Sequence, residues 1–341
     1  MKRLTVAGRL LITVLILGAL FAGYKYLGGE QALEKIATTA QNSSTTAETS
    51  VAERSEADGS ESTSAPDNQA TDTRSGSFNY TAPAPVNGTL KGVVELGASG
   101  FNSFIVRIDN QKRWKLEKAE FGNSLVLENM ATDDDVRMGL KRYIGSMLDF
   151  GVSGKEIHFV VSSGAAKADV TQKISRALKS LGYVVNQVTP EQEGQLGLRS
   201  VLPEEYTSRA FVTDIGSGNT KISWLDGSKI KSVETYGAKY FQAGPDDKTV
   251  YNEVAAKAKQ IPASQRKTCF IIGGVPFEMA KEVRQGKERY TVLKAPDAYQ
   301  LENAKSKAGV NIYKAIAEAT GCEQFVFDWD ANFTIGFLLS L

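Results

Sequence analysis

Two short glycine-rich turns hold the residues best suited to binding an anion. They are residues 95–103 (ELGASGFNS) and 214–221 (DIGSGNTK). Glycine lets backbone N–H groups converge on a phosphate, and serine or threonine hydroxyls add donors. The acids that open the turns, Glu95 and Asp214, are of the type that holds a metal ion or a water beside a phosphate. The pattern therefore predicts a phosphate site.

A double glycine adds a third feature of the same kind. Residues 271–274 (IIGG) place Gly273 and Gly274 between an apolar run and a predicted helix, where a ligand can approach the backbone. Each turn alone is typical of any β-turn, but the repetition is more specific. The phosphate-binding candidates are Gly97, Ser99, Ser103, Gly216, Ser217, Gly218, Asn219, Thr220, Lys221, Gly273 and Gly274.

The elements that must position these turns alternate between strands and helices. The first block has predicted strands at 92–96, 103–108, 113–117, 124–127, 156–161 and 183–188, and helices at 136–150, 169–181 and 191–201. The second has strands at 210–215, 221–224, 230–235, 268–272 and 325–327, helices at 248–259, 276–285 and 303–320, and a closing segment 331–341. Both blocks open with a strand, a glycine turn and a second strand. An α/β fold duplicated into two lobes, 90–205 and 206–341, is expected.

With these motifs in order, the chain resembles the exopolyphosphatase/guanosine pentaphosphate phosphohydrolase (Ppx/GppA) family of the actin, Hsp70 and sugar-kinase superfamily. Residues 214–220 resemble the family's D-I-G-G-G-S-T loop, and residues 160–168 (VVSSGAAKA) resemble T-S-A-x-R-x-A. Residues 188–196 (VTPEQEGQL) resemble S-G-E-E-E-A-R-L. The similarity runs from about Val93 to Gly274, and more loosely to the end of the chain. It implies a two-lobed, actin-like (ribonuclease H-like) fold with a phosphate site between the lobes.

The resemblance also assigns roles and exposes departures. Glu193 falls on the catalytic glutamate that orients or deprotonates the attacking water, and Asp214 falls on an acidic metal or water ligand. Glu95 replaces the usual aspartate of the first loop. If the chain is catalytic, the resemblance implies Mg²⁺ as the cofactor, with Asp214 and Glu95 as its ligands. Lys221 stands where the family has a second acid, and Ala166 where it has an arginine. Losing these charged groups predicts slow hydrolysis at best.

Two functions remain open from sequence. The first is a phosphohydrolase, or a binder, of polyphosphate or a phosphorylated nucleotide. The second is a non-catalytic, actin-like scaffold or sensor with protein partners at the membrane. Lys221 is either an exposed strand residue or a cation that replaces a metal by pairing with phosphate. Glu193 is either the water-orienting acid or a solvated helix carboxylate.

The N-terminus is predicted to be a membrane anchor within residues 1–30. The uncharged run from Leu10 to Tyr24 is short, but Arg9 and Lys25 can snorkel, so a span over residues 4–27 is feasible. A cleaved signal peptide is the rival, with a poor cleavage site. The basic residues before the run favour a cytoplasmic N-terminus and an extracytoplasmic domain. Residues 31–89, rich in Ser, Thr and acids, are expected to be a disordered linker.

Composition narrows the alternatives. The net charge is +1, so nothing in the overall charge indicates nucleic-acid binding. The single histidine, His158, lies in an apolar run and is expected to be structural, which excludes a Ser-His-Asp triad. Cys269 and Cys322 lack zinc-site spacing, and buried free thiols are expected rather than a disulfide.

Overall fold

The computed structural model describes residues 78–97, 100–121, 133–166 and 169–341. The predicted anchor, most of the predicted linker, Ser99, Lys167 and the strand expected at 124–127 lie outside these ranges. In the part of the chain that is described, no helix has both the length and the apolar character needed to cross a membrane.

Lobe I is built on a five-stranded sheet with the order β3-β2-β1-β4-β5. Its strands are β1 (Thr89–Gly97), β2 (Gly100–Ile108), β3 (Trp114–Phe121), β4 (Ile157–Val161) and β5 (Val185–Gln187). Strands β1 to β3 pair antiparallel, whereas β4 and β5 continue in parallel with β1. Helices α3 (Asp133–Asp149) and α4 (Asp169–Ser180) bury one face of the sheet, where Leu140 and Ile174 meet Val94 and Leu96.

Lobe II repeats this plan with a six-stranded sheet of order β10-β11-β9-β6-β7-β8. Its strands are β6 (Ala210–Ile215), β7 (Asn219–Asp226), β8 (Lys229–Tyr236), β9 (Thr268–Gly273), β10 (Tyr290–Val292) and β11 (Gln324–Asp328). Its helices are α6 (Asp247–Ala258), α7 (Gly274–Lys281) and α8 (Ala304–Thr320). Strands β6 to β8 are antiparallel, and β9 and β11 are parallel to β6. Apart from β10, an additional edge strand antiparallel to β11, the two sheets share one strand order, as the repeated sequence blocks predicted.

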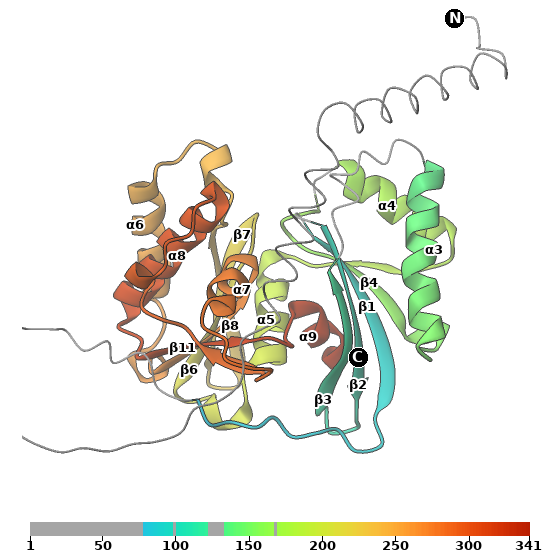
Figure 1. Ribbon diagram of the computed structural model, residues 1–341, viewed down its shortest axis with the longest axis horizontal. Helices are drawn as coiled ribbons and strands as arrows, with labels where there is room; N and C mark the ends of the chain where they lie inside the picture. The colour runs from blue at the N-terminus through green and yellow to red at the C-terminus, as the bar shows by residue number, and fades with distance from the viewer. Residues whose placement is uncertain (1–77, 98–99, 122–132, 167–168) are drawn as a thin grey trace, which may run out of the picture. The chain divides into compact units, whose positions relative to one another are not determined.

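Two helices lie between the sheets (Figure 1). Helix α5 (Pro190–Val201) follows the last strand of lobe I but packs on the lobe II sheet, where Leu198 and Val201 meet Phe270. Helix α9 (Phe333–Ser340) ends the chain yet packs on lobe I, where Ile335 and Leu338 join the core around Val93 and Phe104. The predicted split at residue 205 assigned α9 to lobe II. The structure corrects this, because the apolar α9 covers the face of the lobe I sheet that α3 and α4 leave open.

Residues 78–88 correct the predicted extent of the linker. The rings of Phe78 and Tyr80 pack against Tyr206 and Tyr290 of lobe II, so this stretch has fixed contacts before β1 begins. The reason is chemical: these rings bury apolar surface that the preceding polar residues lack. The cyan segment in Figure 1 runs from lobe II to the start of β1.

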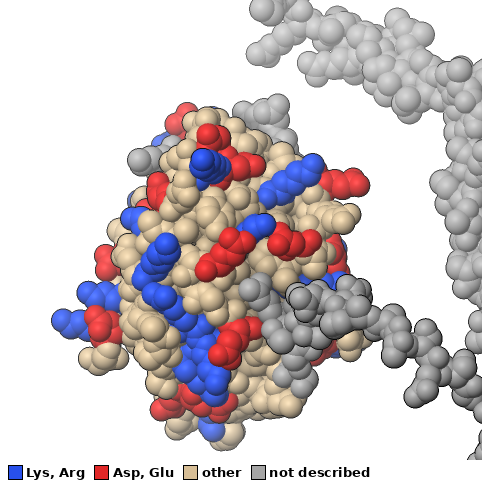
Figure 2. All heavy atoms as spheres, turned by 90° about the vertical axis from the view of Figure 1, so that its left-hand side faces the viewer, with Lys and Arg blue, Asp and Glu red and all other residues tan. Residues whose placement is uncertain are grey.

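Three further expectations concern the two cysteines, His158 and the charge on the surface. Cys269 and Cys322 are both buried and neither is in a disulfide bond, as expected. His158 is half-buried, packs against the ring of Phe337, and lies away from the predicted site. On the face of lobe II shown in Figure 2, acidic and basic side chains lie among one another, and several basic side chains adjoin in a narrow band.

Candidate functional site

A cleft of about 380 Å³ opens between the lobes at the carboxyl ends of β1, β4, β6 and β9. Most of the described candidates from the sequence line it: Glu95, Gly97, Glu193, Asp214, Gly216, Ser217, Gly218, Asn219, Lys221, Gly273 and Gly274. The exceptions are Ser103 and Thr220, which are buried and do not line the cleft. Ser103 follows the cleft residue Asn102 in β2, and Thr220 follows the cleft residue Asn219 in β7. Successive side chains of a strand point to opposite faces of the sheet, so the residue after a cleft residue lies on the other face.

The two glycine turns are matched hairpins. Glu95 pairs with Asn102 across β1 and β2, and Asp214 pairs with Lys221 across β6 and β7. The acid and its polar partner are thus separated by the same number of residues in both lobes. Glycine is required beside the second turn, because a Cβ on Gly237 would lie 2.3 Å from the Asn219 nitrogen.

Hydrogen bonds fix the shape of the second turn. The N–H of Gly216 donates to the carbonyl of Asn219 at 3.0 Å, so it is already used within the hairpin. The carbonyls of Gly216 and Ser217 accept from Ala238 and Lys239 at 2.9 and 3.0 Å. The turn is therefore a preformed wall of the cleft.

Glu193 is placed by the start of α5. Thr189 caps the helix, and Gln192 completes a reciprocal capping box, so Glu193 lies in the first turn. Gly194 lets the helix approach lobe II, because a Cβ there would lie 1.9 Å from Ser232 Oγ. Glu193 is only 3% exposed, which rules out the solvated-carboxylate interpretation.

Lys221 forms a buried ion pair with Glu193. Its Nζ contacts Glu193 Oε1, and the side chains of Lys221 and Glu193 are 3% and 4% exposed. The other carboxylate oxygen, Oε2, accepts the backbone N–H of Ser163 at 2.6 Å. The prediction of Lys221 as an exposed strand residue is therefore wrong. The predicted catalytic carboxylate has a cation on one oxygen and a donor on the other.

Glu95 and Asp214 are the other two acids in the cleft. Glu95 Oε2 accepts from Asn102 Nδ2 at 2.9 Å and from Asn332 Nδ2 at 3.1 Å. Burial raises the pKa of Glu95 to about 7, against the lowering effect of the Asn102 hydrogen bond. Burial also raises the pKa of Asp214 to about 6, although nearby Lys221 opposes this. Both carboxyl groups therefore hold protons more tightly than usual.

Polar contacts join the lobes at the base of the cleft. Asn219 Nδ2 donates to Ser163 Oγ of lobe I at 3.0 Å and to Glu234 Oε1 at 2.6 Å. A Cβ on Gly218 would lie 3.2 Å from the Cα of Gly164, so the two loops pass in close contact. The turn of lobe II is thereby fixed against the β4 loop of lobe I.

Several cleft residues have no equivalent among the sequence candidates. An aromatic wall is formed by Phe104, Phe121, Phe277, Phe327, Trp329 and Phe333. Lys305, in the first turn of α8, reaches the double glycine: its Nζ would lie 3.3 Å from a Cβ on Gly274. Its position after the N-cap Asn303 was the available signal, but periodicity alone does not place α8 beside α7. By contrast, Ala166 packs against the lobe I core and does not line the cleft.

The donor set limits what metal could bind. Among the residues described, no group of three or more His, Cys, Asp or Glu side chains is placed to hold a metal ion. Mg²⁺ is commonly held by one or two carboxylates together with substrate phosphates and water. Asp214 and Glu95 could supply two such carboxylates, and their raised pKa values mean that the site accommodates added positive charge. The residues therefore fit a Mg²⁺ ion that arrives with a phosphate, and not an ion held by the protein alone.

Comparison with known proteins extends the fold assignment. No protein-family model matches the sequence, and no curated protein matches it. Among solved structures, an exopolyphosphatase from Cytophaga hutchinsonii superposes with a TM-score of 0.58 at 15% identity, covering 74% of this chain and 97% of that chain. The Aquifex aeolicus PPX-GPPA enzyme gives a TM-score of 0.55 at 17% identity, covering 74% and 99%. An exopolyphosphatase-like protein gives 0.54 at 13% identity, covering 75% and 98%.

These similarities cover nearly the whole length of the solved proteins and about three quarters of this chain. At identities of 13% to 17%, they show a shared fold. The described domain therefore has the two-lobed, actin-like fold of the Ppx/GppA phosphatases and exopolyphosphatases.

Proposed function

We propose that this domain binds a phosphorylated ligand, either polyphosphate or a phosphorylated nucleotide, in the cleft, and hydrolyses it slowly. The observation that carries the proposal is the buried Lys221–Glu193 ion pair at the place where the family has a water-activating glutamate. The predicted N-terminal anchor would hold the domain at a membrane, with the domain outside the cytoplasm.

The ion pair weakens the chemistry for a simple reason. A general base must lie within hydrogen-bonding reach of the attacking water and must gain a proton. Both carboxylate oxygens of Glu193 already accept hydrogen bonds, from Lys221 and from the N–H of Ser163, so an attacking water would have to compete with these donors. Lys221 also stands in place of a second acid, so one carboxylate that could help to hold Mg²⁺ is missing. Binding can persist under these conditions while turnover falls.

Ligand binding rests on different groups. The matched turns and Gly273–Gly274 line the cleft, so a phosphate can approach these loops, although the Gly216 N–H is already bonded to Asn219 within its turn. Lys305 forms no ion pair among the described residues, so its charge is available to a ligand. Because the cleft also carries Glu95 and Asp214, we expect a polyanion to bind more tightly when Mg²⁺ accompanies it.

The test combines binding and turnover on the full chain. Calorimetry with polyphosphate, ATP and guanosine tetraphosphate, with and without Mg²⁺, should show at least one interaction. Phosphate release should be slow in the wild type, absent in Glu193→Gln with binding retained, and faster in Lys221→Glu with Mg²⁺. Lys231→Glu, an exposed change on β8, is the matched control and should alter neither. Brisk turnover that survives Glu193→Gln would contradict the role of Glu193.

The scaffold or sensor remains the second candidate, because the same ion pair also fits a protein that does not hydrolyse its ligand at all. Absence of turnover in every variant, with binding intact, would favour a sensor. Absence of binding to all three ligands with Mg²⁺ present would favour a scaffold.

A further inference from the structure

The stretch of chain that precedes β1 crosses from one lobe to the other on the side away from the cleft. We call residues 78–86 the strap. At one end, Phe78 packs edge-on against Phe270 and Tyr290, with ring centroids 5.6 and 5.4 Å apart. At the other end, the N–H of Val86 donates to Asp109 Oδ2 of lobe I at 3.0 Å. One short segment thus contacts both lobes.

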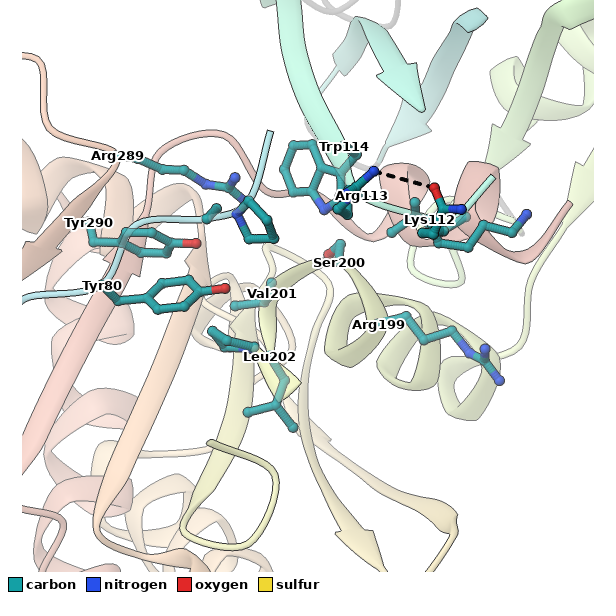
Figure 3. Close-up of a pocket in the computed structure, with 15 residues that line it drawn as sticks. Tyr80, Lys112, Arg113, Trp114, Arg199, Ser200, Val201, Leu202, Arg289 and Tyr290 are labelled. Atoms are coloured by element: carbon teal, nitrogen blue, oxygen red, sulfur yellow. Dashed lines mark hydrogen bonds between the residues drawn. The ribbon is translucent and has the colours of Figure 1, made fainter. Parts of the chain in front are cut away.

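The middle of the strap lines a groove between the lobes. Tyr80, Ala82 and Pro83 line a pocket of about 290 Å³ together with residues of the β2–β3 turn, the end of α5, and β10. Figure 3 shows Tyr80 and Tyr290 side by side, whereas Lys112 and Arg199 point away from the pocket. The side chains of Lys112 and Arg199 are therefore not arranged around an anion, and the strap forms one wall of the groove.

A direct contact between the lobes lies under the strap. Arg289 of lobe II forms a two-bond ion pair with Asp328, at 2.9 Å for each bond, and places its guanidinium 4.1 Å from the ring centre of Trp114 in lobe I. Arg113 is held in turn by Asp109, the same residue that accepts the Val86 N–H. Val86 of the strap is therefore bonded to Asp109, which also holds Arg113 next to the contact between Trp114 and Arg289.

The position of the strap relates its contacts to those of the cleft. The cleft lies at the carboxyl ends of β1 and β6, whereas the strap lies near their amino ends. Helices α5 and α9 pack between the two sheets, and Asp328, the partner of Arg289 beside the strap, also lines the cleft. A rotation of one lobe against the other would therefore change both the cleft and the contacts of the strap.

We propose that the strap restrains the rotation of the lobes and couples the position of the chain before Phe78 to the width of the cleft. Pulling the segment out of its aromatic groove would free the lobes to move. The proposal does not depend on which ligand the cleft binds.

The test measures the distance between the lobes in the full chain, kept in a mild detergent. Lys141→Cys on α3 and Asn252→Cys on α6 are exposed positions for spin labels, and the native Cys269 and Cys322 are buried and should not be labelled. We expect a narrow distance distribution with the native strap, and a width increased about twofold or more in Phe78→Ala/Tyr80→Ala. Asn79→Ala/Thr81→Ala, at exposed positions of the same strap, should keep the narrow distribution.

A second arm avoids the question of whether the aromatic variant folds. A specific protease site placed at the exposed Val86–Asn87 lets the strap be cut after the protein has folded. The cut protein should show the same broadening, and the uncut insertion should not. A distribution that stays unchanged after cutting, or in a folded Phe78→Ala/Tyr80→Ala variant, would overturn the proposal.

Discussion

At the scale of single residues, the main feature is a lysine where the family pattern has an acid. Lys221 and Glu193 are both buried, so each neutralises a charge that would otherwise be costly. We expect Lys221→Met to lower the free energy of unfolding by about 3–5 kcal/mol, because it leaves Glu193 buried and unpaired. Lys221→Met/Glu193→Gln should recover much of this loss, as measured by urea unfolding. A double variant as unstable as the sum of its single changes would contradict this coupling.

The acid Glu95 predicts a pH dependence of stability. Its folded pKa of about 7 lies above the ordinary value of 4.5, so the folded state binds the proton more tightly than the unfolded state. This stabilisation is present below pH 4.5 and is lost as the pH rises to 7, amounting to about 3 kcal/mol. Glu95→Gln removes this loss, so its melting temperature should rise relative to the wild type between pH 5 and about 8.

The control for this comparison is Glu302→Gln, an exposed change whose difference from the wild type should not vary with pH. A Glu95→Gln variant that instead loses stability relative to the wild type as the pH rises would show that the Glu95 pKa is lowered on folding.

At the scale of elements, contact between helices α5 and α9 requires a glycine. A Cβ on Gly336 would lie 1.9 Å from the carbonyl oxygen of Leu196. We expect Gly336→Ala to destabilise the protein by about 1–3 kcal/mol, because the helices must move apart. Gly145→Ala on α3, where a Cβ meets nothing within 4 Å, should be neutral or stabilising by about 0.5–1 kcal/mol. Equal melting temperatures for the two variants would contradict the close contact.

Helix α8 also brings an unpredicted cation to the cleft. Its N-terminal turn places Lys305 beside the double glycine at the start of α7. If a phosphate binds there, Lys305→Ala should weaken its affinity about 10- to 100-fold, the usual range for losing a hydrogen bond to a charged group. Lys307→Ala, exposed on the same helix, should leave the affinity unchanged in calorimetry. An equal effect of both changes would indicate only general attraction by positive charge.

At the scale of the whole molecule, the N-terminal anchor is the feature that the sequence alone predicts. Val14→Arg/Leu17→Arg would add two charges to the apolar run, each costing about 2.5–3.5 kcal/mol at the centre of a membrane helix. We expect the wild type to stay in the membrane fraction after alkaline extraction, and this variant to be released. Mass spectrometry should find the intact N-terminus, whereas a new one near Gly23 would show cleavage.

Local patterns were enough to predict the repeated blocks, the glycine turns and most of the cleft residues. They succeed because strand periodicity and turn chemistry depend on neighbours in the chain, and because a duplicated order of elements implies two similar sheets. The apolar run at the N-terminus and the mixed charge were also readable without coordinates.

Only the tertiary structure decided which residues Lys221, Phe78 and helix α9 contact. Pairing β6 with β7 and packing α5 against them brings Lys221 to Glu193, across 28 residues of sequence. In the same way, packing places Phe78 in its groove and α9 on lobe I. Such contacts depend on which buried faces meet in space, and a solvent-facing and a buried lysine share the same local sequence pattern. The partners of the candidate catalytic glutamate are therefore a property of the assembled fold.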